Sequence, residues 1–190
     1  MNRIPKELQA TKDFQLGLNS ARRAEGVVSR RAQSLANRIE LGADVLASFV
    51  TGLSETEWNT PVSATDRRSI GLVVHHVASM YPIEIGAAQK IAGGQPVTQI
   101  TGDLVDSLNE KHASEQANPS KAETFVLLRE NSRQGADAVR NMTDAELDRA
   151  APFSLSFGAP VTAQFVIEDH ALRHSWHHLA RIRKAVGQKD

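Results

Sequence analysis

Residues 170–182 read His-Ala-Leu-Arg-His-Ser-Trp-His-His-Leu-Ala-Arg-Ile and hold four of the seven histidines of the chain. On an α-helix, residues four apart lie on one face, one turn above the other. His174 and His178 can therefore direct two imidazoles at one point, with His170 one turn earlier. Two imidazoles at this spacing form half of a metal site, because imidazole binds Zn, Ni, Fe and Cu. The other half has to come from elsewhere in the chain.

A second histidine pair, His75-His76, lies about a hundred residues upstream and is the natural source of a further ligand. On the helix expected here, His76 is three residues after Val73 and belongs with the apolar face, whereas His75 is more lateral. The spacing thus favours His76 as the inward-facing group, with His75 behind it or exposed. The seventh histidine, His112, stands alone and is expected to be exposed.

The three stacked histidines of the last helix leave more than one assignment open. At about 100° per residue, a stack at every fourth position drifts by about 40° per step. We therefore expect two of His170, His174 and His178 to bind an ion and the third to act behind them or to face a substrate. Arg181, three residues after His178, could meet an anionic ligand.

The rest of the chain predicts an all-α fold, a four-helix bundle with connections of mixed length. Apolar residues recur at intervals of three and four in four long segments. Pro82 should kink or break the second of them near Tyr81, and a short extra helix is expected between the second and third. Phe153–Gly158 could be a short strand or an extended loop. The four long helices are expected at residues 34–53, 69–92, 121–142 and 161–186.

Composition narrows the class of protein. The 190 residues carry 22 Lys+Arg and 22 Asp+Glu, so no net charge favours nucleic acid or an anionic membrane. No cysteine is present, and no apolar run approaches the ~20 residues of a membrane span. We expect a cytoplasmic protein with one domain at residues 32–187. Residues 1–31 would be an extension, partly ordered or mobile, in which residues 6–18 could form a short helix.

Three segments together resemble the DinB-like (YfiT-like) metalloenzymes, over about residues 32–187. They are Leu53-Ser-Glu-Thr-Glu-Trp58 after the first helix, Ser69-Ile-Gly-Leu-Val-Val-His-His76 in the second, and His170-x3-His174-x3-His178 in the last. In that family one histidine of the second helix and two of the last bind the metal. The resemblance implies His76, His174 and His178 as ligands, in agreement with the helical spacing.

The resemblance also implies a bundle that is often a homodimer and holds a divalent ion such as Ni or Zn. Some relatives are transferases or isomerases that use a low-molecular-weight thiol as cosubstrate, and others are regarded as metal-dependent hydrolases. A small-molecule substrate is expected. No catalytic residue follows from the pattern; His170, His75 and Arg181 are the candidates for a role beside the metal.

Three functions fit the sequence. The first is a metal-dependent enzyme of the thiol-dependent transferase or hydrolase type, in which any thiol must arrive with a ligand because the chain has no cysteine. The second is a non-catalytic bundle that binds a metal or a small molecule. In the third, the histidines are ordinary core and surface residues. Metal analysis of untagged protein separates the third from the other two.

Overall fold

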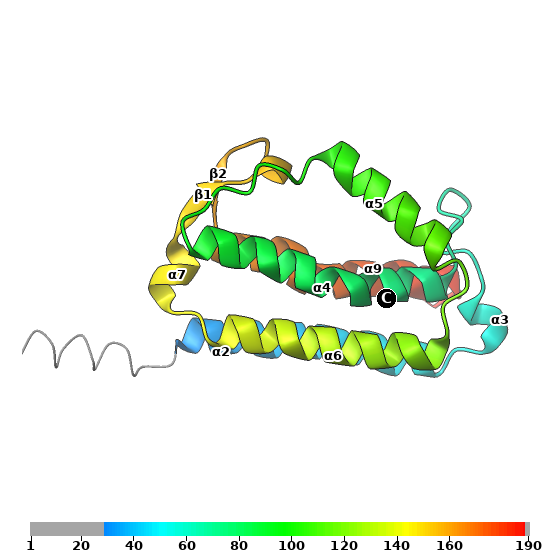
Figure 1. Ribbon diagram of the computed structural model, residues 1–190. Coiled ribbons are helices and arrows are strands. Elements are labelled where there is room, and N and C mark those ends of the chain that lie inside the picture. The colour runs from blue at the N-terminus through cyan, green and yellow to red at the C-terminus, as the bar shows by residue number, and fades with distance from the viewer. Residues whose placement is uncertain (1–28, 189–190) are drawn as a thin grey trace, which may run out of the picture.

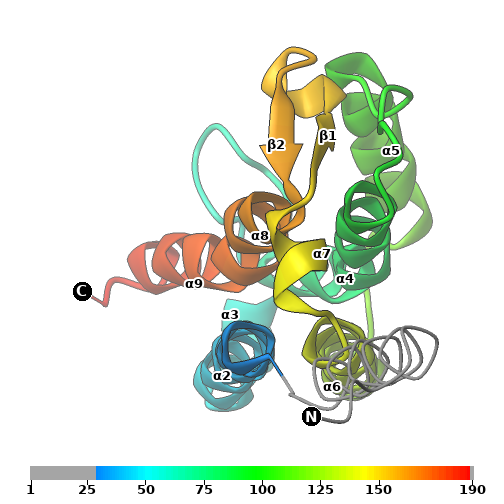
Figure 2. The same cartoon turned by 90° about the vertical axis from the view of Figure 1, so that its left-hand side faces the viewer.

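Four long helical segments form the bundle in the computed structural model, which describes residues 29–188 (Figure 1). α6 packs against both α2 and α4, and α9 packs against the same two helices (Figure 2). The prediction of an all-α four-helix bundle is therefore confirmed. The segments are α2 (Arg30–Thr51), α4 (Ile70–Ala92), α6 (Lys121–Arg140) and a C-terminal helix of three parts, α8 (Ala163–Val166), η2 (Ile167–Leu172) and α9 (Arg173–Ala185).

Shorter elements connect these helices. The predicted extra helix is α5 (Gly102–Glu115), which lies across one side of the bundle (Figure 1). β1 and β2 form an antiparallel hairpin, with Ala151 opposite Val161. Of the two alternatives left open for Phe153–Gly158, the strand is wrong, because the strands flank this segment and it forms the tip of the hairpin. The other short elements are α3 (Glu55–Trp58), α7 (Asp144–Asp148), β1 (Ala150–Pro152), η1 (Ser154–Ser156) and β2 (Pro160–Thr162).

Side-chain caps fix where the helices begin. The hydroxyl of Ser69 accepts a hydrogen bond from the backbone N–H of Leu72, as expected for an N-cap. Ser54 and Thr143 form complete capping boxes with glutamates three residues on. α2 begins at Arg30 rather than near residue 34, because Ser29 caps it. Residues 1–28, including the helix expected at 6–18, lie outside the described part of the chain.

Pro82 does not break the second helix, so of the kink or break predicted near Tyr81 the break is excluded. α4 continues from Ile70 to Ala92 with Pro82 inside it. Proline has no N–H, so the carbonyl of Ala78, four residues earlier, loses its helical partner. The side-chain amide of Asn131 on α6 donates to that carbonyl at 2.9 Å. A residue from the neighbouring helix thus replaces the missing hydrogen bond.

The last helix also differs from the continuous α-helix that was expected. Its middle part, η2, is a π-helix, so each turn there contains more residues than an α-turn. The buried positions step by five across it, from Val166 and Ile167 to Ala171 and Leu172. Phe165, just before this part of the helix, is 44% exposed. Further along, Leu179 and Ile182 of α9 are both buried.

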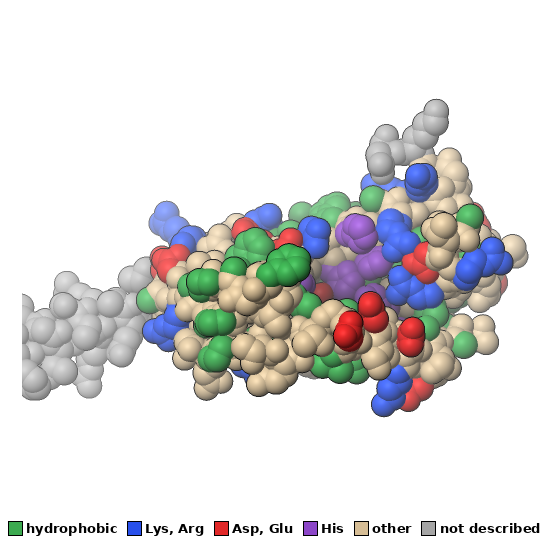
Figure 3. Space-filling model, turned by 90° about the horizontal axis from the view of Figure 1, so that it is seen from above, with side chains coloured by type: hydrophobic (Ala, Val, Ile, Leu, Met, Phe, Trp, Pro, Cys, Tyr) green, Lys and Arg blue, Asp and Glu red, His purple; other side chains and the backbone are tan. Residues whose placement is uncertain are grey.

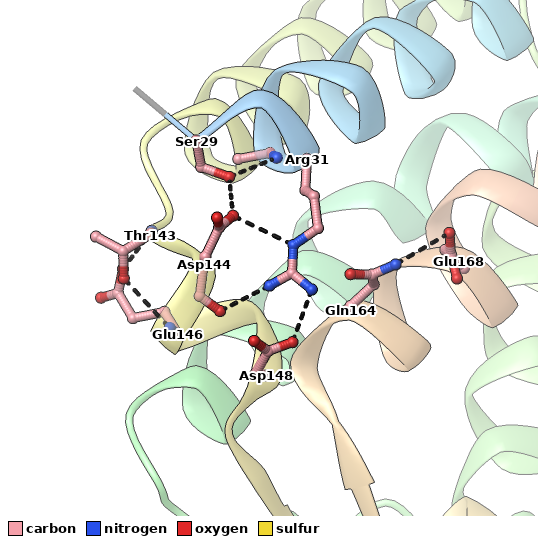
Figure 4. A network of polar contacts seen from close by, with 9 residues as sticks. Ser29, Arg31, Thr143, Asp144, Glu146, Asp148, Gln164 and Glu168 are labelled. Carbon is pink, nitrogen blue, oxygen red and sulfur yellow. Dashed lines mark hydrogen bonds and ion pairs between the residues drawn. The ribbon is translucent and has the colours of Figure 1, made fainter. Parts of the chain in front are cut away.

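α7 is tied to the start of α2 by a polar network at one end of the bundle (Figure 4). Ser29 donates to a carboxylate oxygen of Asp144 at 2.5 Å. The guanidinium of Arg31 contacts that carboxylate at 3.2 Å and the carboxylate of Asp148 at 2.8 Å. These exposed ion pairs hold the connection between α6 and the hairpin in place. None of the helices in the described residues is long and apolar enough to cross a membrane.

Candidate metal centre

Three imidazoles from two helices meet inside the bundle. His76 lies on α4, and His174 and His178 lie on α9; one ring nitrogen of each is within 4.8 Å of the corresponding nitrogens of the other two. The ring centroids are 5.0 Å apart for His76 and His174 and 4.8 Å apart for His174 and His178. These are the three residues that the family resemblance implied; helical spacing favoured His76 over His75 but left the choice among His170, His174 and His178 open. Their convergence depends on the packing of α9 against α4.

Contacts beside the rings hold α4 and α9 together. The hydroxyl of Tyr81 on α4 is 2.6 Å from the hydroxyl of Ser175 on α9, and both side chains are buried. Ser175 is the next residue after His174, so this contact fixes the height of α9 beside α4. Two paired hydroxyls satisfy each other in the core, where an unpaired one would be costly.

The environment keeps two of the imidazoles neutral. His76 is 7% exposed and His178 is 5% exposed. Burial, with a smaller contribution from the nearby His174, lowers the pKa of His76 to about 3 and that of His178 to about 2. A metal binds the neutral form of histidine, so at neutral pH neither group has to lose a proton before it can act as a ligand.

Glu84, a buried acid on α4, also reaches the centre. Its carboxylate oxygen Oε1 is 2.8 Å from Nδ1 of His174, although the two groups are not aligned as a hydrogen bond. Glu84 does not belong to the group of converging ligand atoms. It therefore stands behind His174, in the position of a carboxylate that orients a ligating imidazole.

Unpaired buried atoms indicate what the centre could hold. Among the described residues, Nδ1 of His178 and Oε2 of Glu84 are buried and have no hydrogen-bond partner. Such atoms are costly unless a further group satisfies them. Three imidazoles backed by a carboxylate suit a borderline divalent ion such as Zn²⁺ or Ni²⁺. The residues present thus fit the expected ion.

His75 and His112 form a second pair beside the centre. Nδ1 of His75 lies 2.8 Å from Nε2 of His112, and the hydroxyl of Ser79 lies 3.3 Å from the same His75 nitrogen. The ring centroids of His112 and His76 are 5.7 Å apart. The prediction that His112 is exposed and alone was wrong, because α5 brings it over α4. No local pattern in the sequence reports that contact.

The remaining candidates lie around the three histidines rather than among them. His170 packs edge-on against Phe153, with ring centroids 5.4 Å apart. Arg181 is paired with Asp66, which lies in the loop before α4, at 2.7 Å. His177 is exposed. Seen from the side of α5, histidine side chains gather in a hollow with Lys and Arg side chains at its border (Figure 3).

The fold and the centre together define a helical bundle with a three-histidine group between two of its helices. The family model of the DinB superfamily matches residues 38–182, and the chain belongs to this family. The resemblance inferred from the sequence is thereby confirmed. No curated protein matches the chain significantly.

Among solved structures, the chain is similar to YfiT from Bacillus subtilis, described as "a probable metal-dependent hydrolase with an unusual four-helix bundle topology". The TM-score is 0.68 at 15% sequence identity, over 86% of this chain and 93% of that chain. At this identity the match establishes a shared fold.

Proposed function

We propose that this protein is a metal-dependent enzyme whose divalent ion, Ni or Zn, is held by His76, His174 and His178. The observation that carries the proposal is the convergence of three ring nitrogens within 4.8 Å in a mostly buried setting. The description of YfiT as "a probable metal-dependent hydrolase" supports the same direction. Small molecules are the expected substrates.

The reaction proposed is hydrolysis, or transfer of a group to a low-molecular-weight thiol. Bound at three imidazoles, a divalent ion supplies Lewis acidity and leaves at least one position for water or for the sulfur of a thiol. The protein supplies the geometry. His76 and His178 stay neutral through burial, and Glu84 orients the imidazole of His174.

Metal content of untagged protein tests the proposal directly. The wild-type chain should retain close to one equivalent of divalent ion after dialysis. Replacing His76→Ala or His174→Ala should remove it while the helical circular dichroism is kept. His177→Ala is the matched control, because this neighbouring imidazole is exposed on α9 and should not change the metal content. A wild-type protein without affinity for Zn²⁺ or Ni²⁺ would rule the proposal out.

The role of Glu84 can be measured in the same assay. Glu84→Gln keeps the size of the side chain but loses its charge. Loss of a group that orients a ligand typically weakens metal binding about 10- to 100-fold. Competition with a chelator gives the dissociation constant. Unchanged affinity would show that Glu84 does not support His174.

Activity separates an enzyme from a binding module. The metal-loaded protein is assayed with esters, with amides, and with electrophiles in the presence of a small thiol. Turnover that disappears in His174→Ala and remains in His177→Ala supports the enzyme. A tightly held ion without turnover supports the non-catalytic metal-binding bundle instead. We also propose a homodimer, which sedimentation of the full chain tests.

A further inference from the structure

Two arginines from different parts of the chain share one carboxylate beside the histidine centre. Arg68 donates to Asp66 from Nε at 2.9 Å and from Nη2 at 2.7 Å. Arg181 on α9 donates to the same carboxylate from Nη2 at 2.7 Å. The three side chains are 17–31% exposed, so the cluster is partly withdrawn from water. One carboxylate therefore faces two guanidinium groups.

The cluster lies at the edge of the proposed metal centre. Arg181 follows His178 by three residues on α9, which is about one helical turn. Arg68 ends the loop that leads into α4, the helix of His76. The cluster therefore joins the loop before α4 to α9, and these are the two helices that carry the three histidines.

A structural tie between the loop and α9 would need only one of the arginines. With both present, the cluster keeps one positive charge that Asp66 does not neutralise. Each guanidinium has five N–H donors, and the hydrogen bonds to Asp66 use two on Arg68 and one on Arg181. Among the described residues, no partner is recorded for the other side-chain donors of this pair. Donors are therefore left over in this cluster.

We propose that Arg68 and Arg181 bind a carboxylate of the substrate, while Asp66 holds the two guanidinium groups in position. The proposal rests on the metal-dependent function proposed above and adds the substrate class: small molecules with a carboxylate a few atoms from the group that reaches the metal. A carboxylate suits the planar fork of arginine, and the pair already holds the carboxylate of Asp66. Asp66 is a positioning residue in this arrangement.

Two thiols of nearly equal size test this inference. 3-Mercaptopropionate carries a carboxylate, and 3-mercaptopropan-1-ol carries a hydroxyl at the same place. Each is titrated without oxygen into the Co²⁺-loaded full chain, and the thiolate-to-metal charge-transfer absorption reports binding without any turnover. We expect the wild type to bind the carboxylate thiol about tenfold more tightly, since charge-assisted hydrogen bonds are among the stronger polar contacts.

Variants assign that preference to the arginines. Arg181→Met and Arg68→Met should each bring the ratio of the two dissociation constants toward one and leave binding of the neutral thiol nearly unchanged. Lys184→Met is the matched control, because it removes one positive charge from an exposed position on α9. Arg181→Lys should give an intermediate ratio, since it keeps the charge but loses the fork.

The outcomes separate this inference from the function on which it rests. If Co²⁺ does not bind, the proposed function itself fails. If Co²⁺ binds but neither thiol changes the spectrum, the metal centre stands and the carboxylate site is refuted. If both thiols bind with equal affinity to the wild type, the metal centre stands and the carboxylate site is refuted. A preference that survives both methionine variants also refutes it. A variant with altered circular dichroism is replaced by Arg68→Lys, for which the expected ratio is intermediate as well.

Discussion

The hydrogen bond from Asn131 to the carbonyl of Ala78 should account for the continuity of α4 across Pro82. α4 carries His76 before the proline and Glu84 after it, so both reach the centre only if the helix keeps its course. We expect Asn131→Ala to destabilise the protein, because it leaves the carbonyl of a fully buried residue without a partner.

The size of the effect follows from the setting of the bond. An unsatisfied buried polar group costs about 1–3 kcal/mol. Since Asn131 is only half-buried, water can replace part of the lost interaction, and we expect about 1–2 kcal/mol. Pro82→Ala restores an N–H at position 82 that can bond to Ala78 in the ordinary helical way. In that background Asn131→Ala should cost less than about 0.5 kcal/mol.

The assay is a double-mutant cycle of the four proteins, unfolded in urea at pH 7.5 without metal. The urea concentrations at half-unfolding are compared with one shared dependence of the unfolding free energy on urea, so that a change in midpoint reports a change in stability. We expect a coupling energy of about 1 kcal/mol between positions 82 and 131. Equal costs of Asn131→Ala in the two backgrounds would refute the reasoning, because the amide would then not be compensating for the proline.

Two further predictions concern the core of the centre and the packing of α4. In the folded protein the pKa values of His76 and His178, about 3 and about 2, lie below the ordinary value of 6.5. As the pH falls below 6.5, the unfolded chain therefore takes up protons at these two residues before the folded protein does. The stability of the folded state falls over this pH range. At pH 5 each of these two histidines should lower the free energy of unfolding of the metal-free protein by about 2 kcal/mol relative to pH 7.5. In the double variant His76→Gln/His178→Gln, the urea midpoint should lose this dependence on pH. Gly71→Ala places a methyl carbon 2.4 Å from Trp58 and should lower the stability of the fold by about 1–3 kcal/mol. Gly86→Ala has open space around it and should raise the stability by up to about 1 kcal/mol. Thermal unfolding of both variants measures the two effects.

The sequence could predict features that depend on local spacing. The four long helices followed from the apolar periodicity of their segments. The choice of His76 over His75 followed from its position among apolar neighbours. That these imidazoles converge is a property of the structure, whereas their role as ligands remains the proposal above.

Features that depend on distant partners could not be predicted in this way. Asn131 compensates for Pro82 from another helix, and His112 meets His75 only because α5 lies over α4. Glu84 did leave a signal, since a carboxylate on an otherwise apolar stripe has to find a partner. That signal identifies a buried acid but does not identify His174 as its neighbour.

The π-helical turn explains why three stacked histidines do not form one line of ligands. A continuous α-helix that buries Val166 and Ile167 would next turn His170 inward. The wider turn of η2 instead brings Ala171 and Leu172 into that place, and α9 then buries Ser175 and His178. His170 is thereby left beside Phe153, outside the converging group. The choice between His170 and His178 thus depends on one extra residue in a turn. A regular helical wheel cannot represent that residue, although the five-residue step between the two apolar pairs encodes it.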